Sequence, residues 1–151
     1  PGLTFTEHVI LAGQKKSRFI DWPQGEETAA TRIAEFNIRG RPSTSVESLS
    51  GGNQQRALLA LVRSPLSLLL LEHPTRGLDV ESTIYLWGKL RERLLEGTGI
   101  VFISSELEEL LTYSDRVAVF FAGRMFGPFP TPELTVEQLG ELIGGKGVDL
   151  V

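Results

Sequence analysis

The sequence predicts an α/β protein in which a parallel sheet follows a group of helices. The chain has 151 residues, 41% of them hydrophobic, which is enough for the core of one ordinary domain. Its first half carries apolar residues at helical spacing. After Pro65, short continuous apolar runs alternate with amphipathic segments, a pattern typical of buried strands joined by helices. That order favours parallel pairing through right-handed crossovers.

Two short helices are expected at the front. In LTFTEHVILAG, Thr4 and Glu7 have capping-box spacing, and Gly13 closes the segment. A second helix is expected after the polar turn DWPQG, and Gly40 with Pro42 ends it. The apolar residues expected to face the core are Phe5, Val9 and Leu11 in the first helix and Ala29, Ile33 and Phe36 in the second.

A third helix is expected after Gly51-Gly52 and ends before Pro65. Its buried stripe is predicted to consist of Leu58, Leu59, Leu61 and Val62. LSLLLLE then reads as a strand covered on both faces.

A long amphipathic helix should follow PTRGLD, with Asp79 as its N-cap and apolar positions at Leu86, Trp87, Leu90 and Leu94. GIVFISS predicts a second buried strand, ELEELLTY a short acidic helix, and RVAVFFAG a third strand. A last helix from about Thr135 to Ile143 carries its own capping box, Thr135 to Gln138.

Composition excludes several classes of function. Fifteen basic and nineteen acidic residues give a net charge of −4 without a dense basic cluster, so nucleic acid is not expected as a direct partner. The chain has no cysteine, which excludes disulfides and thiolate zinc sites and fits a reducing compartment. Its longest apolar run, LSLLLL, is far short of the roughly 20 residues of a membrane span. The opening PGLTFTEHV lacks the features of a secretory signal and reads like the middle of a longer protein.

Anion binding is expected at Ser50, Gly51 and Gly52, which immediately precede the third helix. Backbone N–H groups at the start of a helix point toward an approaching anion, and glycines leave room for it. The segment therefore predicts a phosphate-binding site. A plain Ser50 cap followed by a glycine turn is the alternative. The phosphate-binding interpretation is favoured because LSGGNQQR, an apolar strand and PTRGLD follow one another in this order.

These motifs resemble those of the ATP-binding cassette (ABC) proteins over nearly the whole chain. LSGGNQQR looks like the family's signature motif, in the form seen in importers of ribose, galactose, xylose and nucleosides. LLLLEHP occupies the place of the Walker B strand, RGLD that of the D-loop, and ISSELEE that of the switch-histidine segment. SDRVAVFFAGRM is similar to the strand pair that follows.

The resemblance implies a partial P-loop NTPase fold, with a RecA-like parallel sheet and the ABC helical subdomain in front of it. Residues 1–64 would form the helical subdomain with the signature, and residues 65–127 the rear half of the RecA-like core. Residues 128–151 would form a C-terminal helix and tail.

The sequence also departs from the family at its catalytic positions. Walker B normally ends in aspartate and glutamate, but here the pair is Glu72-His73. Glu72 keeps a carboxylate that can reach a magnesium shell, whereas His73 is favoured as a vestigial position over a working base. Ser105 stands at the switch-histidine position and cannot carry the charge of an imidazole. These are degenerate catalytic positions.

No working P-loop is present in the sequence. The segment from Gly140 to Lys146 fits GxxxxGK on paper, but Gly147 replaces the required Ser or Thr and a helix precedes it instead of a strand. The chain is therefore expected to be part of a degenerate second cassette whose Walker A region is missing, and not to bind or hydrolyse ATP alone.

The resemblance implies a role as part of an importer ATPase for sugars or nucleosides, peripheral at the cytoplasmic face of the plasma membrane. Its partners would be a second cassette, which shares ATP and Mg²⁺ with it, and the membrane-spanning permease. Nucleotide contacts are assigned to Ser50, Gly51, Gly52, Gln54 and Asp79, with Gln55 beside them. An exposed sheet edge is also expected to promote self-association.

Two other readings stay open. One is a soluble cassette ATPase outside transport, and the other is a catalytically silent scaffold that keeps the cassette fold for docking. The NQQR form and the absence of basic patches weigh against the first reading.

Overall fold

The structure is a computed structural model that describes residues 2–13 and 19–146. The chain divides into two compact units that meet at the Val101–Phe102 bond. No helix among these described residues has both the length and the apolar character needed to cross a bilayer.

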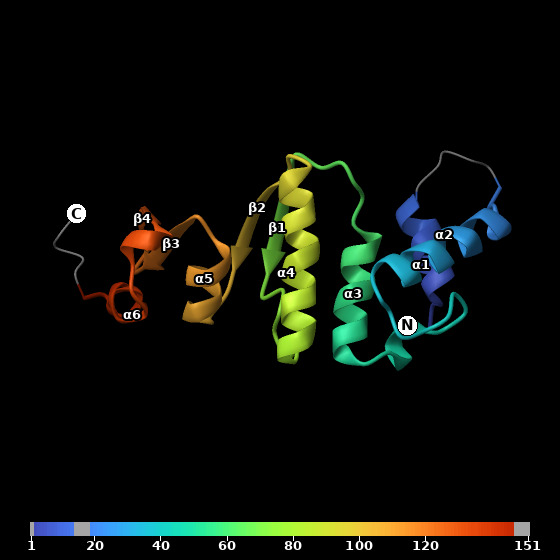
Figure 1. Cartoon of the computed structure of the whole chain (residues 1–151), viewed down its shortest axis with the longest axis horizontal. Coiled ribbons are helices and arrows are strands. Elements are labelled where there is room, and N and C mark those ends of the chain that lie inside the picture. Colours follow the sequence, from blue (N-terminus) through green and yellow to red (C-terminus); the bar gives the residue numbers. More distant parts are fainter. Residues whose placement is uncertain (1, 14–18, 147–151) are drawn as a thin grey trace. The chain divides into compact units, whose positions relative to one another are not determined.

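The first unit opens with a short capped helix, α1 (Phe5–Gly13) (Figure 1). The Thr4 N–H donates to Glu7 Oε2 at 2.6 Å and the Glu7 N–H donates to Thr4 Oγ1 at 3.3 Å, which confirms the predicted capping box. Phe5 and Val9 are buried as expected. Leu11 is 61% exposed, so its predicted place in the core is wrong.

The second helix, α2 (Trp22–Glu35), begins earlier than the sequence suggested. DWPQG is not a turn before the helix but its start, because the Asp21 carboxylate accepts a hydrogen bond from the Gln24 N–H at 3.1 Å. Pro23 is tolerated in the first turn, where its missing N–H would have no helical partner. The helix contacts α1 and α3, Ala29 is fully buried, and Phe36 is buried directly after the helix end.

The third helix, α3 (Gly51–Leu61), follows a single 3-10 turn at Val46–Ser48. Its buried face consists of Arg56, Ala57, Leu59 and Ala60. Leu58 is 60% exposed, so the predicted leucine stripe is wrong at that position. The arginine on the buried face is what the apolar pattern could not predict.

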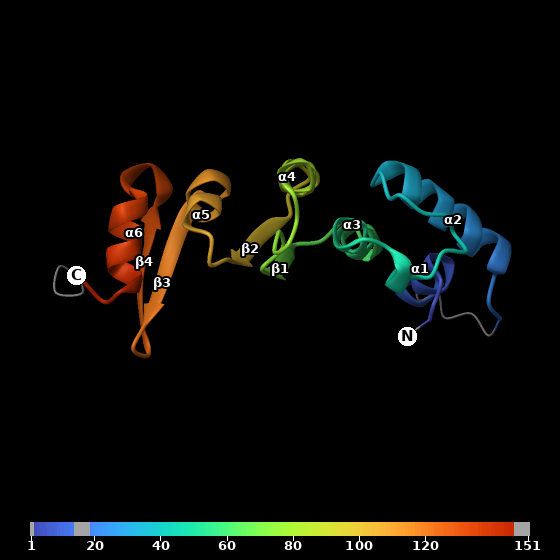
Figure 2. The same ribbon diagram turned by 90° about the horizontal axis from the view of Figure 1, so that it is seen from below.

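The first sheet has two strands, which one helix connects. β1 (Leu68–Glu72) and β2 (Gly99–Ile103) pair with each other and run in the same direction (Figure 1), joined by α4 (Val80–Leu95). Figure 2 shows α4 on one face of this pair. Leu86, Trp87 and Leu90 are buried there as predicted, whereas Leu94 is 43% exposed.

The other face of the β1–β2 pair is open in the described structure. Leu68 and Leu70 are 54% and 68% exposed, and Val101 is 55% exposed. The prediction that these strands are covered on both faces is therefore wrong for this chain by itself, because one helix can cover only one side of a sheet.

The second unit is a β-hairpin packed with two helices. It contains α5 (Leu107–Tyr113), β3 (Arg116–Phe121), β4 (Arg124–Pro130), a 3-10 turn at Thr131–Glu133 and α6 (Val136–Ile143). β3 pairs with β4 in antiparallel register, so it is not the third strand of a parallel sheet with β1 and β2. The strand pair that the family resemblance implied at this position is present.

A small apolar cluster holds the second unit together. Val117, Val119 and Leu139 are buried, and leucines of α5 and α6 pack against them. The predicted cap of α6 is confirmed, because Thr135 and Gln138 exchange the two hydrogen bonds of a capping box.

Candidate functional site

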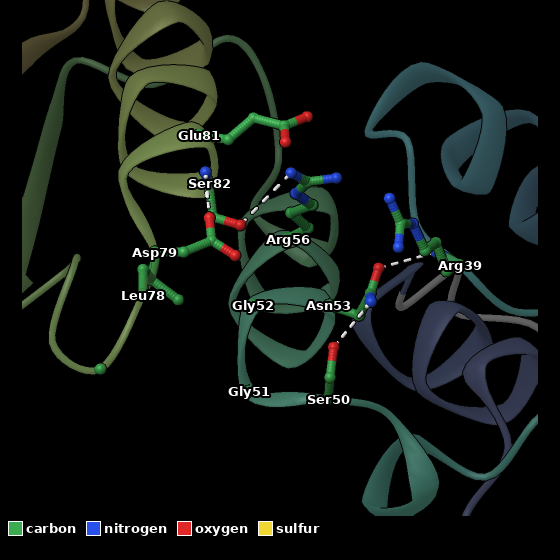
Figure 3. A pocket seen from close by; sticks show the side chains of 11 residues that line it. Arg39, Ser50, Gly51, Gly52, Asn53, Arg56, Leu78, Asp79, Glu81 and Ser82 are labelled. Atoms are coloured by element: carbon green, nitrogen blue, oxygen red, sulfur yellow. Dashed lines mark hydrogen bonds between the residues drawn. The ribbon is translucent and has the colours of Figure 1, made fainter.

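A cavity of about 340 Å³ opens in the first unit beside the start of α3 (Figure 3). The start of α4 and the turn before it supply one part of its lining, and the segment after α2 supplies another. Its lining residues are Arg39, Ser50, Gly51, Gly52, Asn53, Arg56, Gly77, Leu78, Asp79, Glu81 and Ser82.

Ser50 occupies the N-cap position of α3 without acting as a side-chain cap. Its backbone is extended, with φ −62° and ψ 157°, and its hydroxyl makes no capping hydrogen bond. Instead the hydroxyl oxygen accepts a hydrogen bond from Asn53 Nδ2 at 2.8 Å. The hydroxyl proton therefore stays available to donate, and among residues 2–13 and 19–146 no side chain caps the first N–H groups of the helix.

The two glycines of the segment serve different purposes. A side chain at Gly51 would meet no atom within 4 Å, so this position lies open to an approaching group. A Cβ at Gly52 would lie 3.1 Å from Ser82 Oγ, so glycine allows the close approach of α3 and α4 there.

Asp79 caps α4, as the sequence predicted. Its carboxylate accepts a hydrogen bond from the Ser82 N–H at 2.7 Å. Hydrogen bonds from Ser82, followed by the nearby positive charges of Arg56 and Arg39, lower the pKa of Asp79 below its ordinary value. The preceding Gly77 has φ +75°, which turns the chain into the cap.

Arg56 connects α3 to its neighbours from a position that is only 8% exposed. Its Nη1 donates to the carbonyl oxygen of Asn37 at 2.9 Å and its Nη2 donates to Ser82 Oγ at 3.5 Å. The guanidinium carbon lies 4.6 Å from the centre of the Tyr85 ring. Its buried Nε has no hydrogen-bond partner among the described residues.

The glutamines of the signature segment hold neighbouring loops. Gln54 Nε2 donates to the carbonyl oxygen of Leu49 at 3.1 Å and reaches those of Val46 and Glu47. Gln55 Nε2 donates to the carbonyl oxygen of Pro74 at 3.1 Å, which links α3 to the turn after β1. Neither glutamine lines the cavity.

Glu72 and His73 lie at the end of β1 and do not line the cavity. Glu72 is exposed, and His73 has a left-handed backbone with φ +47°. Within residues 2–13 and 19–146, no group of three His, Cys, Asp or Glu side chains gathers as a metal cluster. Glu72 thus fits a magnesium ion only as a single carboxylate beside ligands from the nucleotide, an arrangement common for Mg²⁺.

Ser105 belongs to the second unit, where it is exposed between β2 and α5. Its neighbour Ser104 donates to Glu109 Oε2 at 2.5 Å and accepts from the Glu106 N–H at 3.1 Å. These contacts shape the start of α5.

The structure thus gathers four of the predicted nucleotide contacts, Ser50, Gly51, Gly52 and Asp79, around one cavity. Sequence reasoning missed the other polar residues of the lining. Asn53 and Arg56 were within the quoted LSGGNQQR, and their polarity was the available signal. Nothing in the sequence singled out Arg39, Glu81 or Ser82.

Comparisons with known proteins identify homologues of this chain. It is 38% identical over 155 residues to a nucleoside import ATP-binding protein of Lactococcus lactis, covering 97% of this chain and 30% of that protein. It is 50% identical over 127 residues to a ribose import ATP-binding protein of Rubrobacter xylanophilus, covering 80% and 24%. A xylose import ATP-binding protein of Pseudomonas syringae is 45% identical over 133 residues, covering 86% and 25%.

The chain therefore spans less than a third of the length of these curated relatives. No protein-family model matches it.

Solved structures share the fold. A chain of an inward-facing ABC transporter superposes with a TM-score of 0.76 at 19% identity, covering 95% of this chain and 59% of that chain. The ATP-binding subunit of an ABC transporter superposes with a TM-score of 0.69 at 23% identity, covering 97% and 60%. The predicted α/β cassette fold and the resemblance to importer ATP-binding subunits are confirmed.

Proposed function

We propose, from the homology of this chain to import ATP-binding proteins, that it contributes the signature face of an ATP site completed by a partner cassette. The chain would act as part of the ATP-binding subunit of a sugar or nucleoside importer. The observation that carries this proposal is the start of α3, where Ser50 leaves the helix amides uncapped beside an open glycine.

Each residue of the segment has a role in this proposal. The Ser50 hydroxyl and the N–H groups of Gly51 and Gly52 would donate to the terminal phosphate of ATP held by the partner. Asn53 orients Ser50 through the 2.8 Å hydrogen bond to its hydroxyl oxygen. Asp79, besides capping α4, would lie at the interface between cassettes.

The remaining predicted site residues have weaker roles. Gln54 would stay at the edge of the nucleotide site, since its amide group already binds the backbone before α3. Glu72 would offer one carboxylate to Mg²⁺, which neutralises phosphate charge when bound. His73 and Ser105 would be degenerate catalytic positions, so hydrolysis would depend on groups of the partner. The division into residues 1–64, 65–127 and 128–151 applies to the complete cassette and stays a prediction.

Magnitudes explain why a partner is needed. A helix N-terminus stabilises an anion by at most about 2 kcal/mol, and each hydrogen bond adds about 1 kcal/mol. A millimolar Kd already requires a net binding free energy of about 4 kcal/mol, after the entropy cost of association has been overcome. Nucleotide binding by this chain alone should therefore be weaker than millimolar, and a partner's P-loop would supply the rest.

The other partners follow from the same proposal. An importer subunit would dock on a membrane-spanning permease at the cytoplasmic side of the membrane. The open apolar face at Leu68, Leu70 and Val101 and the free edge of its sheet fit packing against further chain, including self-association in concentrated solution. Sedimentation as a strict monomer at high concentration would contradict the self-association.

The Ser50→Arg variant tests whether the start of α3 acts on ATP held by a partner cassette. The chain is mixed with an intact cassette that carries its own P-loop, and ATP hydrolysis is measured. Wild-type chain should raise the rate, whereas Ser50→Arg should not, because the longer charged side chain blocks the approach of the α3 start. Circular dichroism and the thermal midpoint of the variant should match the wild type. Equal stimulation by both chains would overturn the proposal, and no stimulation by either would favour a silent scaffold.

A further inference from the structure

Arg39 is fixed beside the signature segment by one side chain. It follows α2, and its backbone N–H donates to Asn53 Oδ1 at 2.7 Å. The other end of the same amide, Asn53 Nδ2, donates to Ser50 Oγ at 2.8 Å. Asn53 therefore positions the backbone of Arg39 and the hydroxyl of Ser50 relative to each other (Figure 3).

Among the described residues, the guanidinium of Arg39 acts on its surroundings through its charge near Asp79 and not through a hydrogen bond. Arg39 is exposed and lines the same cavity as Ser50, Gly51 and Gly52. Across the described ranges, its side chain has no hydrogen-bond or salt-bridge partner. The buried Arg56, in contrast, donates from Nη1 to Asn37 and from Nη2 to Ser82 and lies over Tyr85.

The charges of the lining make Arg39 decisive for an anion. Two arginines, Arg39 and Arg56, face two carboxylates, Asp79 and Glu81, so the four side chains sum to zero. Without Arg39 the sum is −1, which repels a phosphate group. An aspartate is ionised at neutral pH, and the hydrogen bonds that Asp79 accepts from Ser82 lower its pKa further.

We propose that Arg39 is a further phosphate-binding residue of the signature face, acting with Ser50 and the first amides of α3 on one oxyanion. This inference rests on the proposed function, in which that oxyanion is the terminal phosphate of a nucleoside triphosphate held by the partner. A guanidinium offers parallel N–H donors that match two phosphate oxygens, and its exposure leaves it free to close on the ligand.

The test uses the complete 151-residue chain and sodium tripolyphosphate as the probe, without magnesium. The amide signals of Gly51 and Gly52 and the Nε–H signal of Arg39 are followed by NMR, against sodium chloride at matched ionic strength. We expect tripolyphosphate to move these signals more than chloride does. The initial slope of the glycine shifts should fall about three- to fivefold in Arg39→Gln, the size of an exposed ion-pair contribution.

Matched variants separate a specific contact from general charge. Arg41→Gln removes an exposed arginine two residues away that does not line the cavity, and it should leave the slope near the wild-type value. Arg39→Lys should retain part of the effect, since the charge remains without the planar donors. Glu81→Gln should increase the slope, because it removes a negative charge from the lining.

Two results would overturn the inference. One is an equal loss in Arg39→Gln and Arg41→Gln, and the other is a wild-type response no larger than that to chloride. Either would leave the proposed function standing, because that depends on Ser50 and the stimulation of a partner cassette. If Arg39→Gln lowers the tripolyphosphate response as expected but Ser50→Arg still stimulates the partner cassette fully, the proposed function is refuted and this inference about anion binding is not.

Discussion

The start of α3 and the end of β1 belong to the same unit, but their polar groups are held in different ways. At the start of α3, Ser50 is oriented by Asn53, and Arg56 ties the helix to α4. At the end of β1, Glu72 is exposed and His73 has an unfavourable left-handed backbone. The start of α3 is therefore held by side-chain hydrogen bonds, whereas Glu72 at the end of β1 lies open to solvent.

This difference fits a division of labour between two cassettes. In the proposed function, the signature face would act on a nucleotide that another cassette holds, so it could keep its geometry without a working Walker B pair of its own. Four substitutions probe the support at the start of α3 and its lack at the end of β1, and the largest effect is expected at Arg56.

Arg56→Ala should destabilise the chain most. The change removes the donors to Asn37 and Ser82 and the stacking on Tyr85, and the side chain is almost fully buried. We expect a loss of about 2–4 kcal/mol in the free energy of unfolding, measured with urea. Arg91→Ala, on the exposed side of α4, should change it by less than about 0.5 kcal/mol. Similar losses in the two variants would remove the distinction.

His73→Gly should relieve the strain at the end of β1. A residue with a Cβ at φ +47° costs about 1–2 kcal/mol relative to glycine, and part of the gain is offset by the flexibility of glycine in the unfolded chain. His73→Ala is the control, because it removes the ring but keeps the Cβ. The glycine variant should be more stable than the alanine variant by about 1 kcal/mol in urea unfolding. The reverse order would mean that the backbone at His73 is unstrained.

Asp79→Ala should lower stability in a pH-dependent way. The pKa of Asp79 is lowered in the folded chain, mainly by hydrogen bonds from Ser82, so its carboxylate stabilises the fold above the unfolded pKa of about 3.9. That contribution is lost as the pH falls through the lowered folded pKa. The difference in thermal midpoint between wild type and Asp79→Ala should therefore be constant near neutral pH and shrink below about pH 4.

Asp79→Asn is the control for that experiment, since asparagine also caps helices but does not titrate. Its midpoint relative to Asp79→Ala should not change with pH through this residue. A wild-type advantage that persists unchanged at pH 2 would show that the carboxylate charge has no part in the cap.

Glu72→Gln should have the smallest effect. The side chain is exposed at the end of β1, and surface substitutions of this kind change the free energy of unfolding by less than about 0.5 kcal/mol. Stimulation of a partner cassette should also stay within about twofold, since one exposed carboxylate contributes little by itself. A large loss of stimulation with unchanged stability would give Glu72 a role in magnesium binding and would place working chemistry at β1.

Local sequence patterns determined the helix caps of this protein. The capping boxes at Thr4 and Thr135 and the cap at Asp79 appear as predicted. The third helix is also present, but it begins at Gly51 and includes the two glycines that were expected to precede it. Such features depend on residues within one or two turns of each other, so spacing alone specifies them. The family resemblance, which rests on motifs in a fixed order, was equally accessible from the sequence.

Other features were decided by contacts between distant segments. The apolar runs at β1 and β2 predicted burial on both faces, but whether a second face is covered depends on what packs there. The apolar pattern of β3 is that of a strand in the parallel sheet, and its pairing with β4 shows that it belongs to a hairpin.

The site itself combines both kinds of information. The sequence by itself placed Ser50, Gly51 and Gly52 at a helix start, because the peptide N–H groups there have no partner within the helix. Only the tertiary structure brought Arg39 beside Ser50 through Asn53 and set Arg56 against Ser82 and Tyr85. Hydrogen bonds and charge pairs over such separations depend on how the helices pack, which no local spacing in the chain records.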